Sequence, residues 1–321
     1  MTNLKNIKRI DFANMTPVIV LVVLCVFMSA LSRVFFSYGN LVNIFQQVTV
    51  NAVLALGMSV VIFTGGIDLS VGSVLAISGI IMGKMMAGGI SPFLACAAGI
   101  IIGALFGTIN GIFISHFRLQ PMIATLGVMS IARGAALTIA EGKTITGYGA
   151  GFRWIGSGTI PGTEIQVQII FMFLLYLLLF YVLKYRKAGR YIYSIGGNEE
   201  ATRLSGINVQ KYKTLAYMIC GIMSAIAGII LVSKLNSAQS IAGEGYELDA
   251  IASSVIGGAS LLGGSGSVWG TLLGAIIMRV IRNGLNLMNV SSYTQRLIIG
   301  VIIIAAVLFD SLRNGKSGRM A

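Results

Sequence analysis

The stretch GRYIYSIGGNEEATRLSGINVQKYK, residues 189–213, carries four basic and two acidic side chains between two apolar runs, 165–184 and 214–233. A helix needs about 20 apolar residues to cross the roughly 30 Å hydrocarbon core of a membrane. Both flanking runs reach that length. The pattern therefore predicts that the chain leaves the membrane near residue 185, forms a charged loop over 185–213, and enters the membrane again.

The whole chain has the composition of a membrane protein. Its 321 residues are 56% hydrophobic and 10% charged, whereas a soluble domain has about 25% charged residues. We therefore predict a single transmembrane domain over 1–321, an all-α polytopic membrane protein of about ten crossing helices. The expected spans are 17–36, 42–63, 69–87, 93–115, 122–140, 165–184, 214–233, 248–262, 268–288 and 294–311. The alternative is eight spans, with 64–92 and 248–270 re-entrant.

The basic residues predict the orientation. If the chain starts inside, the intracellular pieces and the edge residue Lys184 hold 14 of the 23 Lys and Arg residues. Cytoplasmic loops collect Lys and Arg, so we expect both termini in the cytoplasm and no nucleic-acid partner behind the net charge of +13. The start of the chain, with Lys5, Lys8 and Arg9 before an apolar run, also fits a signal peptide. Because further spans follow, we expect an uncleaved first helix.

Local signals predict a short polar helix inside the charged loop. Gly196 and Gly197 are expected to form a turn, and Asn198 is a suitable N-cap. Glu199 and Glu200 then fall in the first helical turn, where negative charge suits the helix dipole. Gly206 is expected to end this helix. A solvated connector and a docking element for a soluble partner both fit such a loop.

No set of residues in the sequence predicts catalysis. His116 is the only histidine, and the three cysteines have neither metal-ligand nor disulfide spacing. The glycine run 263–267 lacks the spacing of a nucleotide-binding loop and is expected to be a tight turn. We therefore predict no enzyme activity, no metal and no cofactor on this chain. If the chain takes part in active transport, the energy has to come from a partner or an ion gradient.

The segment TGGIDLSVGS, residues 64–73, places an acid between two apolar runs. Gly65 and Gly66 are expected to break a helix, and Asp68 is expected to cap the next one. An acid inside a membrane is also a candidate functional residue, because burying a charge is expensive. A proton-coupled carrier generally needs a relay of acids, and no second acid lies deep in another span.

Two further patterns each leave two interpretations. Glycines recur every fourth residue at 99, 103, 107 and 111, on one helix face that suits either packing within the chain or a subunit interface. Arg279 and Arg282 share a face near the outer end of the ninth expected span. Their side chains either extend to the membrane interface or contact an acidic external partner.

Several blocks together resemble the monosaccharide permeases, of ribose type, in the ABC importer superfamily. The segments GIDLSVG at 66–72 and GGNEEATRLSGI at 196–207 are specific in combination. The resemblance extends over residues 40 to 310 and includes the blocks SAQ at 237–239, GYELDAIA at 245–252, GG at 257–258 and NGLNL at 283–287.

What this resemblance implies is an importer of several subunits. Members of the family form a homodimeric pore in the bacterial inner membrane, a cytoplasmic ATPase supplies the energy with ATP and Mg, and a periplasmic or lipid-anchored binding protein delivers the sugar. The loop 185–213 then holds the coupling helix that docks on the ATPase. The implied coupling residues are Gly196, Gly197, Asn198, Glu199, Glu200, Arg203 and Gly206.

Polarity near the spans and in the outer loops suggests the remaining site candidates. Those for the translocation path are Asn51, Asp68, Ser70, Ser73 and Asn110, and those for contact with the binding protein are Glu244, Glu247, Asp249, Arg279 and Arg282. One feature departs from the family, since the region of Arg279 is expected to be more apolar in ribose permeases, with Asn in place of Arg282. This leaves the exact sugar open among ribose, allose, xylose, galactose and autoinducer-2, with a proton-coupled sugar carrier as the remaining alternative.

Overall fold

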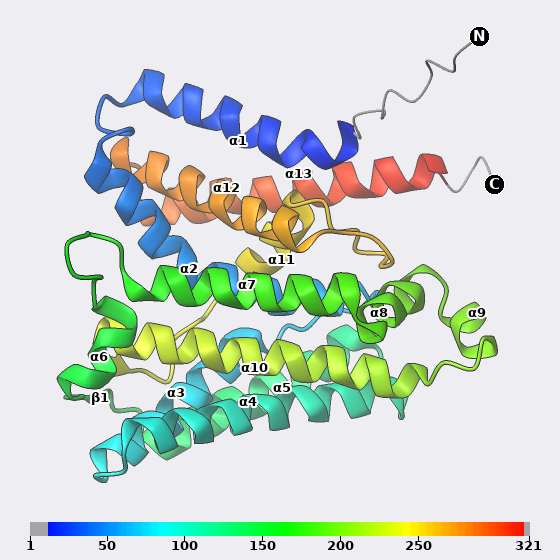
Figure 1. Cartoon of the computed structure of the whole chain (residues 1–321), viewed down its shortest axis with the longest axis horizontal. Helices are drawn as coiled ribbons and strands as arrows, with labels where there is room; N and C mark the ends of the chain where they lie inside the picture. Colours follow the sequence, from blue (N-terminus) through cyan, green and yellow to red (C-terminus); the bar gives the residue numbers. More distant parts are fainter. Residues whose placement is uncertain (1–11, 318–321) are drawn as a thin grey trace.

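A computed structural model describes residues 12–317 of the chain, with side chains from 16 to 308. Long helices run side by side along the longest axis of the molecule (Figure 1). The elements are α1 (Phe12–Leu31), α2 (Tyr38–Ile62), α3 (Val71–Ala87), α4 (Pro92–Ser115), α5 (Pro121–Ala140), β1 (Ile145–Thr146), α6 (Ala150–Ser157), α7 (Val167–Tyr185), α8 (Lys187–Gly197), α9 (Glu199–Leu204), α10 (Val209–Leu235), β2 (Ser237–Ala238), α11 (Tyr246–Ile256), α12 (Val268–Leu287) and α13 (Ser292–Ser317).

Local sequence signals explain where the long helices begin and end. Pro92 and Pro121 occupy the first turns of α4 and α5, where the missing proline N–H costs nothing. Asn208 caps α10 by accepting a hydrogen bond from the Lys211 backbone at 3.0 Å. At the other end of α10, Asn236 takes up a left-handed conformation with φ 51°, as C-terminal residues of helices often do.

The helices divide into a buried centre and an outer layer. In the most apolar 18-residue stretch of each helix, 78% of α2 and 72% of α10 is buried, whereas only 22% of α4 and 28% of α5 is buried. The exposed surface of α4 and α5 is apolar, with Ile101, Leu105 and Ile131 among its side chains. An apolar outer surface around a tightly packed centre is what a hydrocarbon solvent requires.

Each expected span contains a helix, but ten full helical crossings are not confirmed. Among the described residues, six helices are long and apolar enough to cross a membrane: α2, α4, α5, α7, α10 and α12. The helix expected over 248–262 is only the 11-residue α11, about 16 Å long at 1.5 Å per residue. α3 has 17 residues. The two short helices lie in the two segments for which re-entry was the alternative.

The starts of the two short helices lie beside each other, although the expected topology places them on opposite sides of the membrane. A Cβ on Gly72, in the first turn of α3, would collide with the carbonyl oxygen of Gly243, and it would lie 2.9 Å from Oε2 of Glu247. The sequence placed residues 64–68 and 234–247 on opposite sides of the membrane. Instead, the extended chain before each helix passes part of the way through the molecule, so that α3 and α11 begin beside each other.

The glycine ridge of α4 packs within the chain. A Cβ on Gly103 would collide with the carbonyl of Gly221 on α10, and Gly107 and Gly111 face Tyr217 and Thr214 in the same way. Small residues allow such close approach of membrane helices, and dispersion contacts then hold them together. Of the two interpretations of the ridge, the structure therefore shows packing between α4 and α10.

This contact predicts opposite effects for two glycines. We expect Gly103→Ala to lower the stability of the purified protein by about 1–3 kcal/mol, because the added methyl group overpacks α4 against α10. Gly134→Ala on exposed α5 meets nothing within 4 Å and is expected to gain up to about 1 kcal/mol from helix propensity. Thermal unfolding in one detergent measures both. Equal effects of the two substitutions would contradict the packing account.

Candidate functional site

The polar loop between α7 and α10 forms two helices, α8 and α9, at one end of the molecule (Figure 1). Asn198 is the N-cap of α9, since its side-chain oxygen accepts a hydrogen bond from the Ala201 backbone at 2.8 Å. Glu199 and Glu200 lie in the first turn, and Gly206 follows the helix with φ 78°. These three features of the local prediction are confirmed.

Charged side chains of α9 are paired but remain at the surface. Glu200 accepts from Arg203 at 2.6 Å, and Glu199 pairs with Lys213 of α10. The side chains of Glu199 and Glu200 are 54% and 63% exposed. Exposed pairs of this kind contribute at most about 1 kcal/mol. Their charges are therefore available to a partner that reaches this end of the molecule.

The predicted turn at Gly196 and Gly197 is wrong, because both residues belong to the last turn of α8. The chain changes direction one residue later, at Asn198, which is extended with φ −159°. Close packing requires a glycine at position 196. A Cβ there would collide with the carbonyl oxygen of Phe63 and the backbone nitrogen of Gly264.

Three glycine segments thus converge at the end of α8, and we call this contact the glycine junction: Gly65, Gly196, Gly263 and Gly264. The Gly264 N–H donates to the Phe63 carbonyl at 3.1 Å. A Cβ on Gly263 would lie 2.7 Å from the backbone nitrogen of Gly65. Gly65, Gly263 and Gly264 all have positive φ values, which glycine adopts without strain. The junction joins α8 to the loop before α3 and to the turn before α12.

Aromatic side chains reinforce the glycine junction. The rings of Phe63 and Tyr193 stack with centroids 4.8 Å apart, and the Tyr193 hydroxyl donates to the Gly266 carbonyl at 3.3 Å. Burial raises the pKa of Tyr193 to about 12, so its phenol keeps its proton and remains a donor at neutral pH. A displacement of α8 is therefore resisted by both of the loops that it contacts.

A second polar group, the Asp68 cluster, consists of Asp68, Ser70 and Asn110. Oδ1 of Asp68 accepts hydrogen bonds from the Ser70 backbone at 2.9 Å, from the Ser70 hydroxyl at 2.6 Å and from the Asn110 amide at 3.2 Å. All three side chains are buried. The cluster fastens the extended chain before α3 to α4.

The expectation that Asp68 caps α3 needs correction. The N-cap position belongs to Ser70, and Asp68 instead holds Ser70 in place from two residues upstream. Three of the five path candidates therefore lie together in the Asp68 cluster. Ser73 is buried separately in α3. Asn51 lies on α2 and lines a cavity.

The segment before α11 is held by an arginine of α5. The Arg133 guanidinium donates to the carbonyl of Ala242 at 2.9 Å and also to the carbonyl of Ser240. Glu244 is exposed, whereas Glu247 is half-buried near the start of α3. Arg133 therefore fixes the path of the chain that brings α11 beside α3. No local pattern predicts this contact, because the two acceptors lie 107 and 109 positions further along the chain.

The remaining acidic candidate makes an ion pair. Asp249 accepts two hydrogen bonds from Nη2 of Arg282, both at 2.7 Å, and its side chain is 8% exposed. This pair joins α11 to α12. It lies on the wall of a cavity of about 480 Å³. Residues of α2, α11, α12 and α13 line this cavity, among them Arg279 and Arg296, together with Glu244 from the segment before α11.

We expect Asp249→Asn to destabilise the protein, because it leaves the Arg282 charge without its partner. Breaking a fully buried pair costs about 3–5 kcal/mol, and the 28% exposure of Arg282 reduces this to about 1–3 kcal/mol. Arg282→Asn in the same chain should recover much of the loss. Thermal unfolding of the two single variants and the double variant gives the coupling between them. Additive effects would show that the pair contributes nothing.

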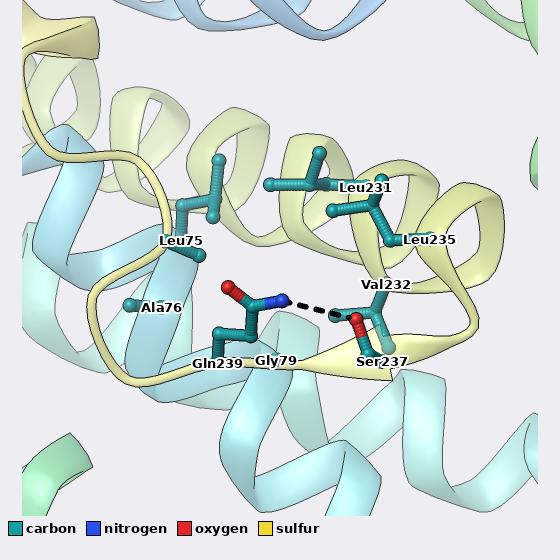
Figure 2. Close-up of a pocket in the computed structure, with 9 residues that line it drawn as sticks. Leu75, Ala76, Gly79, Leu231, Val232, Leu235, Ser237 and Gln239 are labelled. Carbon is teal, nitrogen blue, oxygen red and sulfur yellow. Dashed lines mark hydrogen bonds between the residues drawn. The ribbon is translucent and has the colours of Figure 1, made fainter. Parts of the chain in front are cut away.

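A small cavity between α3 and α10 has a structural role. Figure 2 shows the Gln239 side chain among Leu75, Leu231 and Leu235, with its amide donating to Ser237 at 3.3 Å. The cavity has a volume of about 10 Å³, room for about one water molecule. The block Ser237-Ala238-Gln239 thus packs the β2 segment against α3. Among the described residues, no group of three or more His, Cys, Asp or Glu side chains could hold a metal ion.

Six long apolar helices, two of which (α2 and α10) form the buried centre, together with one polar loop, are the architecture of a multi-pass membrane protein. The chain belongs to the family described as branched-chain amino acid transport system / permease component, whose model matches residues 40–307.

Among its relatives, the chain is similar to the ribose import permease protein RbsC of Escherichia coli (strain K12), with 46% identity over 297 residues, 91% of this chain and 92% of the relative. RbsC of Bacillus subtilis (strain 168) is 45% identical over 94% of this chain and 95% of its own length. The D-allose transport system permease protein AlsC of E. coli K12 is 36% identical, covering 92% and 90%. No solved structure matches the chain.

Proposed function

We propose that this chain is the membrane-spanning permease subunit of an ATP-driven importer of ribose in the bacterial inner membrane. The observation that carries the proposal is the 44–46% sequence identity with ribose import permeases over at least 91% of the chain. Such similarity covers the polar loop, the Asp68 cluster and the cavity together, rather than one motif. The chain itself would carry no ATPase activity and bind no cofactor.

The partners follow from where the polar features lie. We place the cytoplasmic ATPase at α8 and α9, because this end of the molecule displays Glu199, Glu200 and Arg203 at the surface. ATP and Mg would bind to that partner.

The binding protein would approach the opposite end, where β1 and α6 lie (Figure 1) and where β2 pairs with β1. Glu244 is exposed, but its neighbour Gly243 contacts Gly72 at the start of α3, so it lies part of the way through the molecule rather than at that end. A second copy of the chain and the surrounding lipid complete the proposed assembly.

We propose ten crossings, two of them only partly helical. The chain from β2 to Gly263 runs from one end of the molecule to the glycine junction at the other, with α11 forming part of this path. The chain from Gly65 through α3 returns in the opposite direction. An even number agrees with Figure 1, where the start of α1 and the end of α13 lie at the end that bears α8 and α9. The basic residues 5, 8 and 9 that argued for a cytoplasmic start lie outside the described residues.

The glycine junction supplies a route from the ATPase to the crossing segments. Closure of the ATPase would move α8, which touches the loop before α3 and the turn before α12. The Asp68 cluster then connects the first of these loops to α4. ATP shifts the balance between inward-open and outward-open states only through a difference in affinity for those states. Asn51, Asp68, Ser70, Ser73 and Asn110 remain our candidates for the translocation path of the sugar.

The family description also names branched-chain amino acids. The sugar assignment is preferred because the relatives covering more than nine-tenths of the chain at 44–46% identity are ribose import permeases. A proton-coupled carrier is a weaker alternative, since the carboxylate of Asp68 is occupied by three hydrogen bonds within its cluster.

Uptake of radiolabelled ribose into proteoliposomes tests the proposal. The chain is reconstituted with its cognate ATPase and binding protein, and each partner is omitted in turn. Ribose uptake that needs ATP and both partners is the expected result. Uptake of leucine but not ribose would move the chain to the amino acid branch. Uptake by the chain alone under a proton gradient would overturn the ATP-driven mechanism.

A further inference from the structure

Four exposed cations gather where α7 ends and α8 begins, and we call them the basic corner: Lys184, Arg186, Lys187 and Arg190. The chain has no acidic residue between Glu164 and Glu199. Within the part of the chain that the structure describes, none of the four cations makes an ion pair. The basic corner is therefore a concentration of positive charge that is free to meet an anion from outside the chain.

Aromatic rings of α7 hold two of these cations beside that helix. Nζ of Lys184 lies 5.1 Å from the centre of the Phe180 ring and 5.6 Å from the centre of the Tyr185 ring. The guanidinium of Arg186 lies 5.2 Å from the centre of the Tyr181 ring. A cation is attracted to the face of an aromatic ring. Both charges are therefore held against the side of α7 instead of extending away from it into water.

The side of α7 that leads to the basic corner is apolar and exposed. Leu174, Leu178 and Tyr181 are exposed, and their spacing of four and three residues places them on one face of the helix. Because α7 is long and apolar enough to cross a membrane, such a face suits the hydrocarbon of the bilayer. Tyrosine is enriched at the level of the lipid headgroups, and Tyr181 and Tyr185 stand at the end of this face. The basic corner thus lies where lipid headgroups meet the end of α7.

We propose that the basic corner binds an anionic phospholipid of the surrounding membrane. The lipid phosphate accepts hydrogen bonds from Lys184 and Arg186, while an acyl chain follows the exposed face of α7. The planar fork of an arginine matches the geometry of a phosphate, and clusters of Lys and Arg directly beside a membrane helix are typical of anionic-lipid recognition. Lys187 and Arg190, three residues apart on α8, add charge beside the headgroup. The inference needs only the membrane-spanning architecture and goes beyond the proposed import of ribose.

The proposed ATPase is the competing partner for these charges. Its docking surface is placed at α9, where Glu199, Glu200 and Arg203 are displayed and which lies beyond the end of α7 (Figure 1). Lys184 and Arg186 are instead set back from α9, over rings that belong to α7. A cation stacked on a ring of the exposed apolar face is placed to meet a headgroup in the plane of the membrane. The position of the basic corner therefore favours the lipid.

Competition between two phospholipids tests the proposal on the full chain without its partners. The chain in detergent receives equal amounts of phosphatidylglycerol and phosphatidylcholine with identical acyl chains, and native mass spectrometry measures the ratio of the bound lipids. We expect a preference for phosphatidylglycerol, which Lys184→Gln with Arg186→Gln lowers about fivefold or more, since each basic residue near an anionic surface contributes about that factor. Lys184→Arg with Arg186→Lys keeps both charges and should keep the preference. Arg203→Gln on α9 is the matched control and should also keep it. The same ratio in the glutamine variant and the wild type would overturn the proposal.

Tryptophan fluorescence shows whether the lipid is bound at this place. The rings of Trp269 and Phe180 have centroids 5.8 Å apart, and Phe180 carries the Lys184 ammonium. The chain has two tryptophans, so Trp154→Phe leaves Trp269 as the reporter in proteoliposomes. Phosphatidylglycerol with brominated acyl chains should quench Trp269 more strongly than brominated phosphatidylcholine.

The glutamine variant should remove this difference between the two lipids and keep its binding of the ATPase. If the glutamine variant loses co-purification of the ATPase while both lipid measurements stay as in the wild type, the basic corner belongs to the docking surface of the ATPase and the lipid site is wrong. Import of ribose is tested separately, because neither lipid measurement involves the sugar.

Discussion

Replacing Gly196 by valine is expected to abolish ATP-driven uptake, to less than about a tenth of the wild-type rate. The side chain would point into the carbonyl oxygen of Phe63 and the backbone nitrogen of Gly264, neither of which can move without shifting a loop. Overpacking of this kind costs about 1–3 kcal/mol when neighbours yield, and more when they cannot. A loss of 1.4 kcal/mol is about tenfold in an equilibrium. We therefore expect the glycine junction to open and α8 to separate from the loops before α3 and α12.

The neighbouring glycine provides the control. Gly197 lies in the same helical turn, but a Cβ there meets nothing within 4 Å. Gly197→Ala should leave thermal stability within about 0.5 kcal/mol, whereas Gly196→Ala should lower it clearly. Binding of the ATPase by Gly196→Val, measured by co-purification, shows whether the surface of α9 remains intact. Full uptake by Gly196→Val would show that the glycine junction does not couple the ATPase to transport.

Features set by neighbours in sequence were predictable. The cap at Asn198 and the end of α9 before Gly206 depend on a few adjacent residues, and both were predicted correctly. The end of α2 before Gly65 follows from the same logic. The small residues of α4 also identified a packing face, because a repeat of four residues returns to one side of a helix. The sequence left open what packs there, and the structure shows α10.

Features that depend on distant residues were not predictable. Hydropathy alone gave 248–262 the appearance of a span, because an apolar segment looks the same whether it is helical or extended. The close approach of Gly72 to Gly243 shows that the chain passes part of the way through the molecule before α11 begins. The pair of Asp249 and Arg282 joins residues 33 positions apart, and no local pattern reveals it. The stacking of Phe63 on Tyr193, across the glycine junction, is another contact of this kind.

Reversing the charges at Glu199 and Glu200 is expected to uncouple the permease from its ATPase. Both side chains are more than half exposed, so the change should cost the fold at most about 1 kcal/mol through lost surface pairs. At a protein interface, placing a like charge opposite a fixed charge costs several kcal/mol. We expect Glu199→Lys with Glu200→Lys to reduce co-purification of the ATPase at least tenfold and to bring ribose uptake to background, while the protein remains monodisperse.

A charge swap within α9 distinguishes docking from local stability. Glu200→Arg combined with Arg203→Glu keeps an ion pair at the same three-residue spacing, so the helix should remain as stable as in the wild type. If the ATPase recognises the surface of α9, the swapped chain also loses the ATPase. If the pair only stabilises the helix, the swapped chain transports normally. Unchanged co-purification and uptake in the double reversal would remove α9 from the docking surface. The short turn of α8 at the glycine junction would then be the remaining contact through which ATP binding could act on α3 and α12.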